Sequence, residues 1–267
     1  MSALPVDRLF DDASQFPPGD LGLEPAVAAH AEWRAGPRSA LVGRFLTPAA
    51  RAAPLAAALA DAGAGAGDGW ELGLVVAADA DPAAAAEAAA ALGGVAAAVT
   101  SIEIPLAAGP RAFAAWSEAF PAADRFAEGT AEDLPTIAEA QAKAKLRCGG
   151  ATAAAVPAPT DVATFLGACA ERELPFKATA GLHQPLRHHD AALGADQHGF
   201  LNLLVATAAA RAGASAAELE ALLLVTELDG LELGDHDLAG ARGLFEAFGT
   251  CSVQEPIDGL RALGLLA

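Results

Sequence analysis

The sequence contains two short stretches with a cation near the middle of each, Ala144-Lys145-Leu146-Arg147-Cys148-Gly149-Gly150 and Phe176-Lys177-Ala178-Thr179-Ala180-Gly181-Leu182-His183. Each stretch is typical of a short β-strand that runs into glycine. Because strand side chains alternate between two faces, Lys145 and Arg147 share one face, and so do Lys177 and Thr179. Burying lysine and arginine within a strand is costly unless they meet an anion or change protonation. The two stretches therefore predict a functional site.

Strand-like and helix-like segments alternate on both sides of these stretches. Further strands are predicted at 40–46, 72–77, 95–104, 125–128, 231–233 and 250–253. Helices are predicted at 48–62, 81–92, 110–119, 132–141, 161–172, 198–212, 215–225, 238–248 and 258–266, and a Gly-rich turn at 64–69. Such alternation indicates right-handed βαβ crossovers and a parallel sheet.

The number of units and the chain length favour one large domain. Seven or eight βα units in 267 residues match an α/β fold of the (β/α)8 TIM-barrel type. We therefore expect residues 1–267 to form a single barrel, with 1–36 as an N-terminal arm and helix. A doubly wound parallel sheet is the alternative.

Composition narrows the classes of partner. The net charge of −18 argues against binding nucleic acid or an anionic membrane surface, and it makes a local cluster of cations informative. Three separated cysteines and the absence of a signal peptide favour a reducing cytoplasm. Gly63, Gly65 and Gly67 precede a strand instead of following one, so they predict a turn and no dinucleotide-binding motif. We expect the protein to act on a small anionic substrate and to need no cofactor. The composition is compatible with a homo-oligomer.

Lys177 is the first candidate for catalysis, because an amine desolvated beside other cations loses its proton easily and can attack a carbonyl. The alternative is a charged Lys177 paired with Glu103 or Glu128. The other catalytic candidates are Lys145, His183, Glu103 and Glu128. Candidates for substrate binding are Arg147, Arg44, Thr179, Gly149, Gly150, His198 and Asn202. Arginine suits a carboxylate or phosphate, and glycine allows close approach of the backbone to a ligand.

Histidines concentrate in one segment. His183, His188, His189 and His198 lie within sixteen positions, with Asp190 among them. Their spacing matches no metal-ligand signature, so we predict no metal site, although a metal-dependent hydrolase or lyase using them is an alternative. His183 directly follows the Lys177 stretch, which suits proton transfer.

The two lysine stretches resemble (β/α)-barrel lyases of the class I aldolase type, which carry a Schiff-base lysine on a late strand. The resemblance implies an imine on Lys177, with Lys145 lowering its pKa or assisting proton transfer. His183 and His198-Gly199-Phe200-Leu201-Asn202 also resemble uncharacterised proteins of high-GC bacteria. The predicted function is a lysine-dependent lyase, aldolase or isomerase acting on a small anionic carbonyl compound. A non-catalytic binding barrel with ion-paired lysines is the other alternative.

Overall fold

A computed structural model describes residues 4–62, 69–77, 80–90, 92 and 97–266. Within these residues eight parallel strands close into a barrel, in the order β1-β10-β7-β6-β5-β4-β3-β2. The predicted (β/α)8 barrel is thus confirmed, and the open doubly wound sheet is excluded. The barrel strands are β1 (Phe10–Asp12), β2 (Val42–Pro48), β3 (Trp70–Val75), β4 (Ala97–Pro105), β5 (Asp124–Glu128), β6 (Lys143–Arg147), β7 (Phe176–Thr179) and β10 (Phe245–Thr250).

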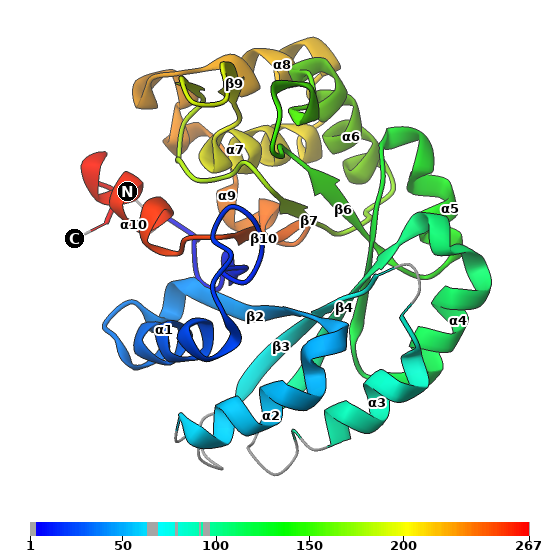
Figure 1. Ribbon diagram of the computed structural model, residues 1–267. Helices are drawn as coiled ribbons and strands as arrows, with labels where there is room; N and C mark the ends of the chain where they lie inside the picture. The colour runs from blue at the N-terminus through cyan, green and yellow to red at the C-terminus, as the bar shows by residue number, and fades with distance from the viewer. Residues whose placement is uncertain (1–3, 63–68, 78–79, 91, 93–96, 267) are drawn as a thin grey trace.

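Helices surround the strands on the outside (Figure 1). They are α1 (Leu23–Ala35), α2 (Ala52–Asp61), α3 (Pro82–Ala90), α4 (Gly109–Ala119), α5 (Leu134–Glu139), α6 (Pro159–Glu171), α7 (Phe200–Arg211), α8 (Ala216–Leu224), α9 (Leu238–Ala241) and α10 (Gln254–Ala262). The predicted Gly-rich turn at 64–69 lies, except for Gly69, outside the described residues.

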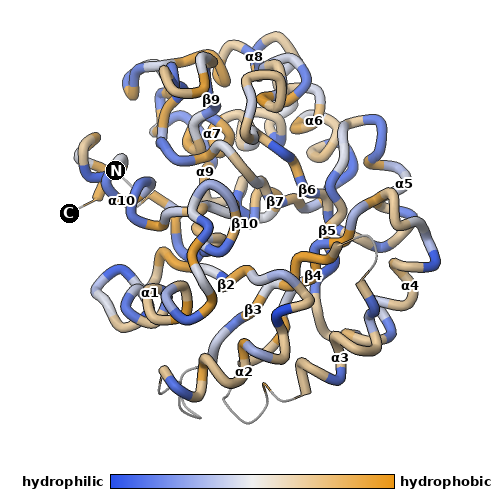
Figure 2. Tube along the Cα trace, in the orientation of Figure 1, coloured by the Kyte–Doolittle hydropathy of each residue, from blue (hydrophilic) through white to orange (hydrophobic). Residues whose placement is uncertain are grey.

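The apolar core lies between the outer faces of the strands and the helices. Phe10 of β1 and Phe248 of β10 pack against Phe200 of α7, with ring centroids 5.1–5.7 Å apart. On the neighbouring strands, Phe45 of β2 packs against Trp70 of β3. Because apolar side chains take the outward positions, the inward positions are free to carry polar groups. Figure 2 shows hydrophilic residues within β5 and β6, beside apolar ones.

One helical segment of the described chain, Ala153–Glu171, is long and apolar enough in composition to span a membrane. It contains α6, whose Val162, Phe165 and Leu166 are buried in the core. Helix α6 also packs on α7 and α8.

Two predicted elements at the barrel closure were wrong. The N-terminal arm contains β1, which pairs with β2 and β10; three residues, two of them acidic, give too short a pattern to identify a strand. The predicted strand at 231–233 falls instead in two 3-10 turns, Leu228–Leu231 and Leu233–Asp235.

The predicted helix at 238–248 also differs. It stops at Ala241, and the chain continues as strand β10 from Phe245 to Thr250. Gly240 and Gly243 weaken the helix, and the buried phenylalanines that follow fit the barrel wall. The predicted strand at 250–253 therefore lies too late in the chain.

The segment after β7, in which no helix or strand was predicted before residue 198, contains a short antiparallel hairpin. Its strands are β8 (His188–Asp190) and β9 (Ala195–Gln197). The hairpin belongs to the long connection between β7 and β10, at the carboxyl end of the barrel.

Candidate functional site

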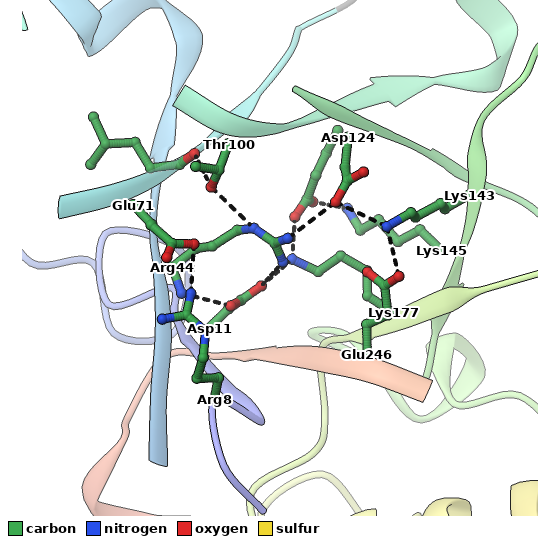
Figure 3. A network of polar contacts seen from close by, with 12 residues as sticks. Arg8, Asp11, Arg44, Glu71, Thr100, Asp124, Lys143, Lys145, Lys177 and Glu246 are labelled. Atoms are coloured by element: carbon green, nitrogen blue, oxygen red, sulfur yellow. Dashed lines mark hydrogen bonds and ion pairs between the residues drawn. The ribbon is translucent and has the colours of Figure 1, made fainter. Parts of the chain in front are cut away.

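A chain of alternating charges crosses the inside of the barrel (Figure 3). Strands β6 and β7 are in register, so that Lys145 pairs with Lys177 and Arg147 with Thr179. Both lysines turn toward carboxylates of β1, β4 and β5. The expectation from strand parity, that the cations share the inner face, agrees with this arrangement.

Lys177 lies at the centre of this network. Its Nζ donates to Oδ2 of Asp11 at 2.6 Å and to Oε1 of Glu103 at 2.7 Å, and its side chain is fully buried. Burial alone would lower the pKa of Lys177, but the two carboxylates outweigh burial and raise it above the ordinary value. The predicted neutral amine is therefore wrong, and Lys177 takes the alternative ion-paired state with Glu103.

Glu103 is shared between the two lysines. Its Oε2 lies 2.7 Å from Nζ of Lys145, while its Oε1 accepts from Lys177. Burial alone would raise the pKa of Glu103, but the two ammonium groups lower it from 4.5 to about 2. A carboxylate held ionised in this way is a weak proton acceptor and a strong electrostatic support for Lys145.

Glu128 and Arg147 form the layer nearest the carboxyl end. Arg147 donates from Nε at 2.6 Å and from Nη2 at 3.1 Å to the two oxygens of Glu128. Lys145 lies 3.2 Å from the same carboxylate. Burial would raise the pKa of Glu128, but Arg147 and Lys145 hold it below the ordinary value. Half of the Arg147 side chain, 49%, is exposed, so this guanidinium can also meet a ligand.

Arg44 lies in the opposite half of the barrel. It contacts Asp124 at 3.4 Å and Thr100 at 3.3 Å, both near the amino ends of their strands. Lys143 joins Asp124 at 2.9 Å to Glu246 at 2.6 Å in the same layer. Arg44 also lies 3.8 Å from Asp11, the partner of Lys177, so it joins the network around Lys177 from the layer near the amino ends of the strands.

The carboxyl end of the barrel holds a cavity of about 770 Å³. Loop residues 13–18, the ends of the strands, the segment after β7 and the β8–β9 hairpin line it. The predicted site residues among its lining are Glu103, Lys145, Arg147, Gly150, Thr179 and His183. Lys177 is not among the described residues that line it; it lies beneath, in contact with Glu103.

Two of the predicted substrate-binding residues, His198 and Asn202, have structural roles away from the cavity. His198 is fully buried, and its Nε2 lies 2.9 Å from the carbonyl oxygen of Pro157. Asn202 is also buried and donates to the carbonyl oxygens of Leu222 and Val225, at the end of α8. Both residues fix helices behind the barrel and do not reach the cavity.

Gly149 serves close packing of two loops. A Cβ at this position would lie 2.8 Å from Cα of Gly181, so the loops after β6 and β7 touch through their backbones. Gly150, the next residue, does line the cavity. The approach of a glycine backbone to a ligand stays a prediction for Gly150, which is placed at the cavity.

The four clustered histidines separate in space. His189 is exposed and lies 2.9 Å from Asp196 on the hairpin, whereas His198 is buried against Pro157. His183 and His188 line the cavity. Among the described residues, no group of three histidine, cysteine, aspartate or glutamate side chains is placed to hold a metal ion.

Two residues of the site were missed in the sequence. Asp11 pairs with Lys177, and its signal was the acidic pair that follows Leu9-Phe10 in the arm. Cys251 lines the cavity beside His183. In the sequence, only its position directly after the apolar stretch that forms β10 indicated that it lies at the end of a strand. Glu255 also lines the cavity, from the first turn of α10.

No protein-family model and no curated protein sequence matches this chain. The resemblance to class I aldolases therefore rests on the lysine strands and on the barrel alone.

Proposed function

We propose that this protein is a lyase or isomerase that moves a proton on a small anionic carbonyl compound. The observation that carries the proposal is the common cavity of Lys145, Arg147 and His183 at the carboxyl ends of the strands. This end carries the active site in characterised (β/α)8 enzymes. The cavity volume suits a small molecule.

Arg147 would anchor the anionic end of the substrate. Its guanidinium already binds Glu128 through two parallel hydrogen bonds, the geometry that carboxylates and phosphates also accept. Because the side chain is half exposed, a ligand can share or replace Glu128 without unfolding the strand.

Lys145 would stabilise negative charge that develops on the carbonyl oxygen. Its Nζ lies at the cavity floor between Glu103 and Glu128, and its side chain is 9% exposed. The electrostatic attraction between a fixed cation and a developing negative charge becomes stronger when water is excluded from the site. Lys177 would act as a positioning residue, since it holds Glu103 under Lys145.

His183 would transfer the proton. Its side chain is 21% exposed and lines the cavity. Histidine accepts and gives protons near neutral pH, so it suits enolisation next to a carbonyl. A Schiff base on Lys177 would instead require this ammonium to lose its proton between two carboxylates, so the proposed chemistry is electrostatic and acid–base.

The first test measures anion binding. Phosphate, sulfate and malonate at low ionic strength should raise the melting temperature by roughly 5–10 °C at concentrations about a hundredfold above Kd. Arg147→Ala should abolish the rise. Arg172→Ala is the matched control, because Arg172 lies at the end of α6 and pairs with Glu171. An equal rise in the Arg147 variant would contradict the anchor.

The second test measures proton transfer. In D2O the protein should exchange the α-protons of small oxo-acids, followed by NMR. Lys145→Met and His183→Asn should each lower the exchange rate about a hundredfold. Exchange at the uncatalysed rate across a panel of oxo-acids and sugar phosphates would contradict the enzyme assignment.

A non-catalytic anion-binding barrel is the second candidate. It is favoured by the pairing of Lys177 with Asp11 and Glu103, which needs no ligand for its stability. Anion-dependent stabilisation that requires Arg147, without any proton exchange, would select this candidate.

A further inference from the structure

Cys251 lies in the mouth cavity at the end of β10, beside His183. Its Sγ is 3.9 Å from Nε2 of His183. The other ring nitrogen, Nδ1, lies 2.8 Å from Oε2 of Glu255 in the first turn of α10; the pair is ionic only when the imidazole is protonated, and its geometry is not that of a hydrogen bond. A thiol, an imidazole and a carboxylate thus follow one another along one wall of the cavity, and all three residues line it.

Cys251 is also the most accessible of the three cysteines. Cys148 and Cys169 are fully buried, and burial raises the pKa of both thiols, that of Cys169 to about 12. Cys251 is only partly buried. A reagent that enters the cavity therefore meets this thiol, while the other two cysteines serve as internal controls.

The resting thiol is protonated. Burial raises the pKa of Cys251, and the carboxylates of Glu255 from α10 and Asp12 from β1 raise it further, while a hydrogen bond from the backbone N–H of Gly19 partly offsets them. Asp12 is itself paired with the buried His30, 3.0 Å away. Attack by this sulfur therefore needs a base that removes the proton, and Nε2 of His183 is in position to do so.

We propose that Cys251 is a catalytic nucleophile that adds reversibly to the carbonyl carbon of a small anionic aldehyde, with His183 as its base. The proposal rests on the proposed function for the substrate class only. The thiol proton passes to His183 as the S–C bond forms and the C=O π bond opens. The same proton then returns to the alkoxide oxygen, which leaves a hemithioacetal with an uncharged hydroxyl and the anionic end unchanged, and consumes no other reactant. Arg147 and Lys145, which line the same cavity, would hold the anionic end.

Alkylation tests the nucleophile. Iodoacetamide should modify the folded protein at neutral pH, with displacement of iodide by Sγ, and peptide mass spectrometry should place the increment on Cys251 and leave Cys148 and Cys169 unmodified. His183→Asn should slow the reaction about a hundredfold. His188→Asn is the matched control, because His188 lines the same cavity and its Nδ1 contacts the carbonyl oxygen of Leu186.

Glyoxylate, the smallest anionic aldehyde, tests the substrate class. It should protect Cys251 from iodoacetamide more strongly than it protects a free cysteine peptide, and Arg147→Ala should lose the extra protection. A rate of alkylation that His183→Asn leaves unchanged would overturn the proposal. Protection equal to that of the free peptide would overturn it as well.

The Cys251→Ser variant separates this proposal from the proposed function. It should bind phosphate and malonate as the wild type does, with the same rise in melting temperature, because Arg147 and Lys145 are untouched. Failure of alkylation with an intact anion response rejects the nucleophile alone. Loss of the anion response in wild-type protein rejects the proposed function.

Discussion

Lys177→Met would remove the central cation of the barrel and leave its carboxylate partners in place. Methionine matches the lysine stem in shape, so the main change is electrostatic. Asp11 and Glu103 lose hydrogen bonds of 2.6 and 2.7 Å from a side chain that water does not reach. Both carboxylates are themselves buried.

The contacts that Asp11 and Glu103 keep in the variant determine how much stability it loses. Removing one partner of a buried ion pair typically costs about 3–5 kcal/mol. Lys145 still holds Glu103 at 2.7 Å, and the backbone N–H of Arg44 still donates to Asp11 at 2.8 Å. We therefore expect the lower end, about 3 kcal/mol of the unfolding free energy.

Urea titration at pH 7 measures this loss. Lys143→Met is the matched control, because Lys143 is another inward lysine with two carboxylate partners, but its side chain is 27% exposed. It should lose about 1 kcal/mol at most. Lys177→Met combined with Asp11→Asn should recover part of the stability, since it removes one uncompensated charge. Equal losses in the two single variants would refute the reasoning.

Acid titration gives an independent measurement. The pKa of Glu103 is about 2 in the folded protein, against an ordinary value of 4.5. Its contribution, roughly 3 kcal/mol, is present above the unfolded pKa and is lost as pH falls toward 2. Without Lys177 the folded pKa of Glu103 rises, so the variant should lose stability at higher pH than the wild type. An unchanged acid-unfolding midpoint would contradict this linkage.

Four further predictions follow from single contacts. Glu128→Gln should strengthen the rise in melting temperature caused by phosphate, because the ligand no longer competes with Glu128 for Arg147; a weaker rise would mean that Glu128 helps to bind it. Burial lowers the pKa of His198, so unfolding below about pH 6.5 takes up a proton at this residue and the folded state loses stability as pH falls. His198→Asn should therefore make the unfolding free energy decrease less between pH 7 and pH 5, as measured by urea titration at several pH values. Gly149→Ala should cost about 1–3 kcal/mol in urea, whereas Gly234→Ala, with open space around its Cβ, should change stability by less than about 0.5 kcal/mol. Chelator treatment should leave the melting temperature unchanged, and a stoichiometric zinc or manganese by elemental analysis would contradict this.

The sequence predicted the barrel and the inward cations because both depend on local patterns. Alternation of side chains along a strand fixes the faces of Lys145, Arg147 and Lys177 whatever the rest of the chain does. Glu103 and Glu128, at the ends of their strands, could be placed at the same end for the same reason. The pattern of alternating strands and helices then leaves few topologies.

The protonation of Lys177 could not be predicted in this way. The direction of the pKa shift of Lys177 depends on Asp11, which lies 166 residues away in a strand of three residues. Strand parity brought a second cation, Lys145, beside Lys177, which argued for a neutral amine. The carboxylates between the two lysines reverse that effect, and only the closed barrel brings them there.

The position of the cavity within this charge pattern supports the mouth of the barrel as the site. Deeper in the barrel Lys177 and Lys143 each meet two carboxylates; the side chain of Lys177 is fully buried, whereas that of Lys143 is 27% exposed. Toward the carboxyl end the pattern changes: Arg147 has a single carboxylate partner among the described ion pairs and half of its side chain is exposed. A chain with a net charge of −18 repels small anions at long range. Under the proposed function, an anion that reaches the mouth would therefore gain its binding energy from Arg147 and Lys145 at short range, and the carboxylates of Glu103 and Glu128 would hold both cations in place.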